Sequence, residues 1–246
     1  MIHNWHIGTS GWSYDDWKHK FYPKGYLSGN KHLPYFSKHF STAEINATFY
    51  RIIKEETFQG WYEKTPEDFL FSIKLHQYLT HSKRLKMDDA ANSRLDLFLK
   101  STSHLKEKAG PVLVQLPPNL KEDHYRLKDW LESMPEYRYA VEFRHKSWLN
   151  DKTAQLLHEH NAAMVYSHSP EIPMWLNITA DFLYMRFHGP KEFYKSKYTD
   201  KQLDEEINKI KNVERLENCR DIFIYFNNNY KGFAIDNARY VKSLVS

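Results

Sequence analysis

Eight short runs rich in β-branched and aromatic residues alternate with helix-like segments, and this alternation narrows the folds that the chain can adopt. The runs cover residues 6–12, 42–49, 69–76, 111–117, 138–145, 162–168, 182–189 and 221–228. Helix-like segments separate most of them, although 169–180 is a poor helix. Strict alternation implies parallel strands joined by right-handed crossovers. Eight such units in 246 residues predict a (β/α)8 barrel of the TIM type, with an open doubly wound sheet as the alternative.

The predicted strands carry polar side chains at every second position. In the run "YAVEFRH", Glu142 and Arg144 share one face, while Ala140, Val141 and Phe143 can pack. Barrel strands send alternate side chains toward the axis, so these polar residues are expected to face inward. The same pattern gives Glu44, Asn46, Lys74, His76, Arg186 and His188, and Gln115, Asn227 and either Ser167 or His168 complete the ring. Most of them lie near the carboxyl ends of strands, where TIM-barrel active sites are found.

Composition excludes several classes of protein. No apolar run approaches the roughly 18 residues of a membrane span, and the N-terminus lacks the pattern of a signal peptide, so we expect a cytoplasmic protein of one domain, 1–246. Cys219 is the only cysteine, which excludes an intrachain disulfide and a cysteine-based zinc cluster. A net charge of +4 tolerates an anionic partner without the strong basic bias of a polyanion-coating protein.

Seven motifs resemble those of domain of unknown function 72, also called the YecE-like family, which is bacterial and archaeal. They are "IGTSGWSYDDWKHKFYP", "AEINATFYR", "FSIKLHQYLTH", "GPVLVQLPPN", "YAVEFRHKSW", "YMRFHGP" and "IYFNNNYKGFAIDNA", in family order from residue 7 to about 240. The resemblance implies a TIM barrel but no established activity. Its pattern includes Ser10, Trp12, Glu44, Asn46, Lys74, Gln115, Glu142, Arg144, Arg186, His188 and Asn227. His168 departs from it, because relatives commonly carry an acidic residue there.

The charges of the inward set favour an anionic ligand. Glu44, Lys74, Glu142, Arg144, Arg186 and His188 together carry about +1 with His188 neutral. Arginine recognises carboxylate or phosphate through two hydrogen bonds, and lysine offers a compact charge. We therefore expect Arg144, Arg186 and Lys74 to bind substrate, with Asn46, Gln115, Asn227, Trp12 and Ser10. Glu142 or Glu44 is expected to act as general base and His188 as the partner acid, without a cofactor.

Three alternatives remain open. Glu44, His76, Glu142, His168 and His188 could ligate a divalent metal, as in a phosphodiesterase resembling endonuclease IV. The loops after the first and seventh strands interleave aromatic residues with lysines, which suits a nucleotide or a nucleic acid. The third alternative is a ligand-binding barrel without catalysis. A shifted carboxylate pKa beside an open pocket would indicate an enzyme, whereas a fully ion-paired, closed mouth would indicate a binding protein.

Overall fold

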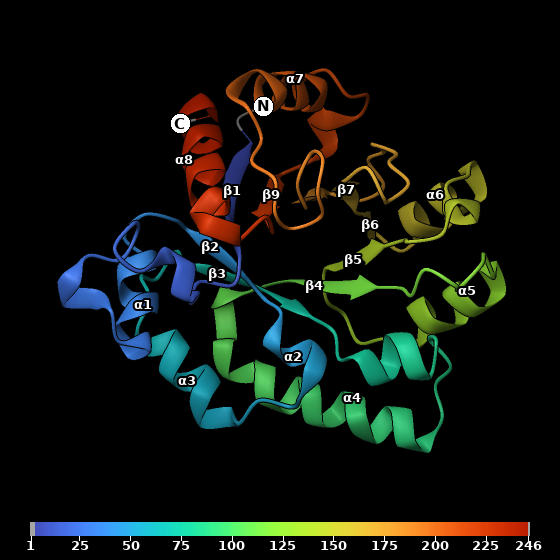
Figure 1. The fold of residues 1–246 in the computed structure, drawn as a ribbon. Helices are drawn as coiled ribbons and strands as arrows, with labels where there is room; N and C mark the ends of the chain where they lie inside the picture. The colour runs from blue at the N-terminus through green and yellow to red at the C-terminus, as the bar shows by residue number, and fades with distance from the viewer. Residues whose placement is uncertain (1–2, 246) are drawn as a thin grey trace.

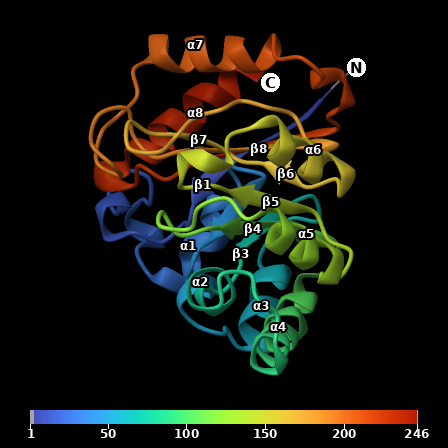
Figure 2. The same cartoon turned by 90° about the vertical axis from the view of Figure 1, so that its right-hand side faces the viewer.

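A computed structural model describes residues 3–245 and shows strands at the centre of the molecule with helices around them (Figures 1 and 2). The strands are β1 (Asn4–Ser10), β2 (Thr42–Ile45), β3 (Leu70–Lys74), β4 (Ala109–Gln115), β5 (Tyr139–Glu142), β6 (Ala163–Met164), β7 (Tyr166–His168), β8 (Phe182–Phe187) and β9 (Asp221–Phe226). The α-helices are α1 (Gly29–Phe36), α2 (Ala47–Tyr50), α3 (Glu55–Glu63), α4 (Asp89–Thr102), α5 (His124–Ser133), α6 (Asp151–Glu159), α7 (Asp200–Lys211) and α8 (Phe233–Val245).

All nine described strands belong to one parallel sheet in the order β6-β5-β4-β3-β2-β1-β9-β8-β7. β1 pairs with both β2 and β9, so the first and last strands are neighbours, as a barrel requires. The sheet is a nearly closed barrel, and an open doubly wound sheet does not fit this order. The alternation of strands and helices in the sequence therefore predicted the class of fold correctly.

The predicted count of eight strands is not confirmed, because the sixth run forms two strands. β6 pairs with β5 through Ala163 and Met164, whereas β7 pairs with β8 from Tyr166 onward. Val165 lies between them and still donates its backbone N–H to Val141 of β5 at 3.0 Å. One segment of chain therefore changes partner within a few residues and brings the two ends of the sheet together.

Most of the expected helices form, and side chains at their N-termini explain where four of them begin. Asp88, Asp123 and Asn150 each accept a backbone N–H at the start of α4, α5 and α6. Thr199 and Gln202 form a reciprocal capping box at α7. Such caps satisfy backbone donors that have no partner inside the helix. The segment 169–180 is not helical, as its sequence indicated.

The barrel interior below the polar ring is mainly apolar and aromatic. Its buried cluster consists of Leu113, Ala140, Ala163, Val165, Ala180, Phe182, Tyr184, Phe223 and Tyr225. The Tyr225 hydroxyl lies 2.7 Å from the hydroxyls of both Thr42 and Ser72, so its polar end has partners despite burial. This filled interior gives the polar side chains at the carboxyl ends of the strands a rigid floor.

The close approach of β1 to β2 leaves no room for a side chain at Gly8. A Cβ atom on Gly8 would lie 2.1 Å from the backbone oxygen of Thr42, which cannot move without disturbing the sheet, whereas a Cβ on Gly60 of α3 would meet nothing within 4 Å. We expect Gly8→Ala to lower the free energy of unfolding by about 1–3 kcal/mol or more. Gly60→Ala should leave it unchanged or raise it by up to about 1 kcal/mol. Urea unfolding would show whether the two substitutions change the free energy of unfolding in opposite directions. Equal stabilities of the two variants would contradict the close contact between Gly8 and Thr42.

Candidate functional site

The polar ring is centred on Arg186 of β8, which is 1% exposed. Its Nε and NH2 groups donate to the two carboxylate oxygens of Glu44 at 2.9 and 2.8 Å. Its NH1 group donates to Glu142 Oε2 at 2.6 Å. The guanidinium therefore joins β8 to β2 and β5 across the barrel, in the two-point geometry that arginine forms with carboxylates.

Glu44 is fully buried, and four side chains donate hydrogen bonds to its carboxylate. Besides Arg186, the Ser10 hydroxyl donates at 2.7 Å, the Tyr184 hydroxyl at 2.8 Å and Asn46 Nδ2 at 3.1 Å. Burial alone would raise the pKa of Glu44, but the charge and hydrogen bonds of Arg186, with those of Ser10 and Tyr184, hold this pKa below its usual value. Glu44 is ionised and its oxygens are occupied.

Glu142 has a similar environment at the end of β5. Gln115 Nε2 donates to it at 2.8 Å and the Ser167 hydroxyl at 2.7 Å, so Ser167 rather than His168 completes the ring. Burial again opposes ionisation, but the charges of Arg144 and Arg186 outweigh it and lower the pKa of Glu142 well below its usual value. A carboxylate held this strongly in its ionised form is a weak proton acceptor.

His188 lies beside Glu142 but is enclosed. Its Nε2 is 3.5 Å from Glu142 Oε1, and Asn227 Nδ2 is 3.3 Å from its Nδ1. The ring stacks on Phe193 with centroids 5.0 Å apart. Burial and the nearby Arg186 charge lower the pKa of His188 to about 4, so the imidazole is neutral near pH 7. Its contacts suit a role in holding Glu142.

Lys74 of β3 stands at the edge of this network and is 8% exposed. Its Nζ donates to Gln115 Oε1 at 2.9 Å and lies 4.0 Å from the centre of the Phe49 ring. Burial, followed by the charge of Arg186, lowers the pKa of Lys74 to about 7, although Glu142 and Glu44 act in the opposite sense. Lys74 can therefore gain or lose a proton near neutral pH.

Arg144 lies just beyond β5 and has unused donors. Its NH2 group is 2.7 Å from Glu142 Oε1, close enough for an ion pair but not aligned for a hydrogen bond. Its buried Nε has no hydrogen-bond partner, while its side chain is 14% exposed. A buried donor without a partner costs free energy unless a ligand or water satisfies it. Arg144 therefore combines unpartnered donors with partial exposure.

Trp12 and Asn46 border a cavity of about 320 Å³ beside the ends of β1 and β2, which is also lined by Gly11, Ser13, Tyr14, Ile45, Ala47 and Trp61. The Trp12 ring meets Trp61 edge to face at 5.1 Å. Asn46 Oδ1 is buried without a hydrogen-bond partner. Trp17, in contrast, is fully buried and its indole N–H donates to the Asn229 carbonyl, as a packing residue would.

The five predicted metal ligands are not brought together. His168 points to the helices outside the barrel, with Nδ1 2.9 Å from the Tyr198 hydroxyl and Nε2 3.6 Å from Glu206 of α7. His76 lies past the end of β3, accepts the Tyr78 N–H and is influenced by Arg94 of α4. Within residues 3–245, no three His, Cys, Asp or Glu side chains are grouped so that they could hold a metal ion.

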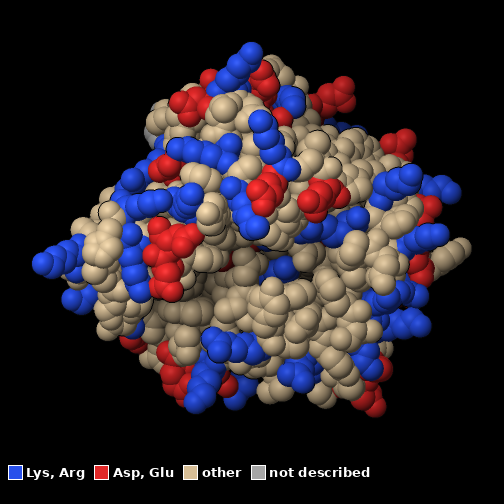
Figure 3. Space-filling view, viewed as in Figure 1, with Lys and Arg blue, Asp and Glu red and all other residues tan. Residues whose placement is uncertain are grey.

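Several lysines of the loops around the barrel are engaged by neighbours. Lys18 pairs with Asp15 at 2.7 Å, and Lys197 pairs with Asp236 at 2.6 Å. Lys20 donates to the Lys231 carbonyl. Figure 3 shows basic and acidic side chains interspersed around a largely uncharged central area, without a continuous basic band on this face.

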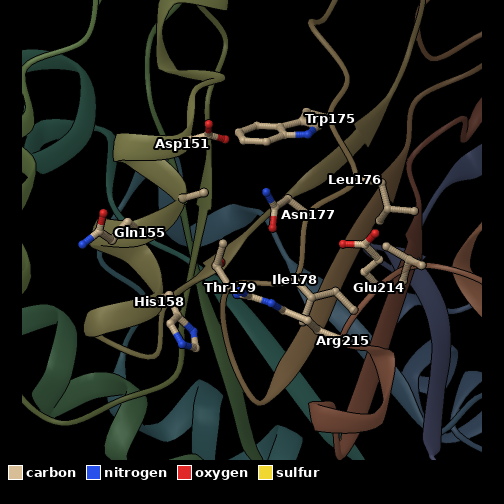
Figure 4. A pocket seen from close by; sticks show the side chains of 12 residues that line it. Asp151, Gln155, His158, Trp175, Leu176, Asn177, Ile178, Thr179, Glu214 and Arg215 are labelled. Carbon is tan, nitrogen blue, oxygen red and sulfur yellow. The ribbon is translucent and has the colours of Figure 1, made fainter.

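A larger cavity of about 550 Å³ lies away from the polar ring, between α6 and the segments 175–179 and 213–215. Figure 4 shows Asp151 and His158 on one side of it and Glu214 and Arg215 on the other, with Asn177 between them. This cavity occupies the region where the sixth crossover lacks a helix. We place the candidate site at the polar ring despite the greater volume here, because the ring contains the buried charges and the displaced pKa values.

Two contributors were not predicted from the sequence, namely Tyr184 and Phe193. Tyr184 precedes Arg186 by two positions on β8, so strand alternation placed it on the inner face, but its hydroxyl was not recognised as a partner of Glu44. Phe193 lies in the loop after β8, where it covers His188 and lies 5.7 Å from the Arg144 guanidinium. No local pattern predicts such a loop contact.

The network predicts a pH-dependent loss of stability in Glu142→Gln. Replacing the charge leaves Arg186 and Arg144 without a counter-ion, so unfolding at neutral pH should require about 3–5 kcal/mol less free energy. Because the folded-state pKa of Glu142 is lowered, its stabilisation is present above about pH 4.5 and is lost as the pH falls below it. Urea unfolding at several pH values should show the wild type and variant converging in acid.

The matched control is Glu132→Gln on α5, where the side chain is 52% exposed and the pair with Lys128 is long at 3.7 Å. It should change the unfolding free energy by less than about 0.5 kcal/mol. A Glu142→Gln protein as stable as this control at neutral pH would contradict the network.

Comparison with known proteins gives relatives along the whole chain. The model of the family described as "Protein of unknown function DUF72" matches residues 6–246. The UPF0759 protein YunF of Bacillus subtilis (strain 168) is 28% identical over 271 residues, covering 98% of this chain and 94% of the relative. The UPF0759 protein YecE of Escherichia coli (strain K12) is 32% identical over 143 residues, covering 57% of this chain and 48% of the relative.

Solved structures agree with this relationship. A DUF72 family protein from Thermotoga maritima superposes with a TM-score of 0.85 and 30% identity, covering 99% of both chains. A DUF72 family protein from Enterococcus faecalis gives a TM-score of 0.79 at 19% identity, covering 98% of this chain and 95% of that chain, and supports the fold alone. Within the described residues, no helix has both the length and the apolar character needed to cross a membrane. The resemblance noted in the motifs is confirmed, and the chain belongs to the DUF72 family of proteins of unknown function.

Proposed function

We propose that this protein is an enzyme that transfers protons on a small anionic substrate at the carboxyl-terminal mouth of the barrel. The observation that carries this proposal is Lys74, whose amino group lies at the edge of the polar ring with a pKa lowered to about 7. A group that titrates near the working pH is suited to general acid or base catalysis. Displaced pKa values also occur preferentially at functional sites.

The anionic character of the substrate follows from which charges are already neutralised. Arg186 is satisfied by Glu44 and Glu142, whereas the Nε group of Arg144 has no partner. Arg144 is paired with Glu142 at 2.7 Å but keeps donors without hydrogen bonds, so an incoming carboxylate or phosphate group would find these donors and the protonated amine of Lys74. Such charge-assisted hydrogen bonds are stronger than neutral ones.

The two glutamates and His188 then act on the other groups of the site. Glu44 and Glu142 hold the arginines in place, and His188 and Gln115 orient Glu142. Their predicted roles as base and acid remain to be tested, but their contacts favour Lys74 as the proton carrier. Ser10, hidden behind Glu44, supports that carboxylate rather than substrate, while Asn46, Asn227 and Trp12 remain candidates for binding.

A non-catalytic binding barrel is the second candidate, because both carboxylates of the ring are fully ion-paired. The two candidates share the anion site and differ in whether a proton is transferred. They are therefore separated by two measurements, one of binding and one of exchange. No observation on the described residues favours a nucleic-acid or metal-dependent reaction over these.

Anion binding should weaken as the pH rises through about 7, because Lys74 loses its charge there. Calorimetry with sulfate suits this test, since sulfate keeps its charge between about pH 6 and pH 8. Arg144→Gln should reduce the affinity for sulfate by about 10–100-fold at about pH 6 and at about pH 8 alike. Lys74→Met should bind more weakly at pH 6 and lose the pH dependence.

The control for this experiment is Lys128→Met on α5, which replaces an exposed lysine outside the polar ring. This variant should bind sulfate as the wild type does. Equal sulfate affinity in Arg144→Gln and Lys128→Met would show that the anion does not bind at Arg144 in the barrel mouth. A pH dependence that survives in Lys74→Met would assign the titration to another group.

Catalysis is tested by incubating pyruvate and other small carboxylic acids with the protein in D₂O. NMR then measures how fast their carbon-bound hydrogens exchange for deuterium. The wild type should accelerate exchange, and Lys74→Met should lose about 10²–10⁴-fold of the acceleration, as expected for removal of a general base. Lys128→Met should retain it. Sulfate binding without exchange of any such compound would identify a binding barrel instead.

A further inference from the structure

The amino group of Lys74 is held in place without an ion pair. Glu142 fixes the orientation of the Gln115 side chain, because a carboxylate accepts hydrogen bonds and the Gln115 Nε2 group donates to it at 2.8 Å. The Gln115 oxygen is thereby presented to Lys74 Nζ at 2.9 Å. An amide oxygen accepts an N–H from a protonated amine and, more weakly, from a neutral one. Deprotonated Lys74 can therefore keep its position and still expose a lone pair.

Burial and neighbouring positive charge oppose protonation of Lys74. The ring of Phe49 covers one side of Nζ at 4.0 Å and helps to exclude water from it, although the face of the ring also attracts the protonated amine. Arg186 and, more weakly, Arg144 add positive charge nearby, while Glu142 and Glu44 offset part of it although both are ion-paired with these arginines. Burial and an adjacent cation are the two conditions that activate a lysine as a nucleophile, and Lys74 has both.

We propose that Lys74 forms an imine with the carbonyl group of a small oxo acid whose acid group binds Arg144. This inference rests on the proposed function and specifies its substrate class as a carbonyl compound that also carries an anionic group. Arg144 suits the second part of this substrate, because its unpartnered Nε lies within the same charge network as Lys74.

The chemical step is balanced without any further reactant. The lone pair of the Lys74 amine forms a bond to the carbonyl carbon, and the C=O π electrons move to oxygen to give a carbinolamine after proton transfer. Loss of that oxygen as water, with the remaining N–H proton released, forms the C=N bond. The net reaction is amine plus carbonyl giving imine plus water, and protonation of the imine makes the adjacent C–H bond more acidic.

Borohydride trapping tests this step on the unaltered chain. The protein is incubated at about pH 7 with glyoxylate, borohydride is added, and peptides are mapped by mass spectrometry. Hydride adds to the imine carbon, so Lys74 should carry a carboxymethyl group. An ordinary lysine with a pKa near 10.4 has roughly a thousandth of its amine free at this pH compared with one near 7, so Lys74 should be labelled at least about tenfold faster than Lys128.

Acetaldehyde, which has the carbonyl but no acid group, is the matched probe. It should label Lys74 at least about tenfold more slowly than glyoxylate in the wild type, and Arg144→Gln should abolish this preference. Because Lys74 is identified on the wild-type protein, the central result does not depend on the folding of any variant. If Arg144→Gln kept the same preference for glyoxylate over acetaldehyde as the wild type, Arg144 would not be the residue that binds the acid group.

Labelling spread over surface lysines, with Lys74 unmodified, would overturn the imine. This outcome is distinct from failure of the proposed function, because sulfate binding that weakens through pH 7 and exchange of carbon-bound hydrogen could both persist with Lys74 as a simple base. Absence of sulfate binding and of exchange would remove the proposed function itself. Trapping on Lys74 by glyoxylate in preference to acetaldehyde would support both the imine at Lys74 and the proposed function.

Discussion

The three-point contact of Arg186 with Glu44 and Glu142 is the constraint on which the rest of the mouth depends. Three charged groups are buried completely or almost completely there, and burying an unpaired charge is costly. The side chains that surround them are consequently donors directed at the carboxylates, such as the Ser10, Tyr184 and Ser167 hydroxyls. The requirement to satisfy these two carboxylates explains why the barrel mouth is so polar.

The same pairing explains the unusual state of Lys74. If either glutamate bonded directly to Lys74, the amine would remain protonated at neutral pH. Instead the arginines occupy the carboxylate oxygens, and Gln115 stands between Lys74 and Glu142 as a neutral relay. Burial, followed by the charge of Arg186, therefore lowers the pKa of Lys74 to about 7, although Glu142 and Glu44 offset part of this effect. The chemistry proposed for Lys74 is therefore a consequence of the structural network.

Much of this arrangement was predictable from period-two alternation. Glu142 and Arg144, or Arg186 and His188, had to share a face of a strand, and parallel strands had to bring those faces together at one end. Alternation gives no information about which carboxylate meets which arginine across the axis, since that depends on strand stagger. It also could not show that Arg186 would be saturated while Arg144 kept a free Nε, or that His168 would turn outward. The change of partner at Val165 was equally hidden, because the sixth run reads as one continuous strand.

That change of partner gives the charge network a second role in the barrel. The sheet closes through the single segment 163–168, which is bonded to β5 as far as the backbone N–H of Val165 and pairs with β8 from Tyr166. Across this junction, Ser167 of β7 and Arg186 of β8 both donate to Glu142 of β5, at 2.7 and 2.6 Å. Side-chain hydrogen bonds therefore add to the backbone pairing at the place where the segment changes from one neighbouring strand to the other. Glu142 joins the closure of the barrel to the positioning of the cations at its mouth, so a change at this residue acts on fold and site together.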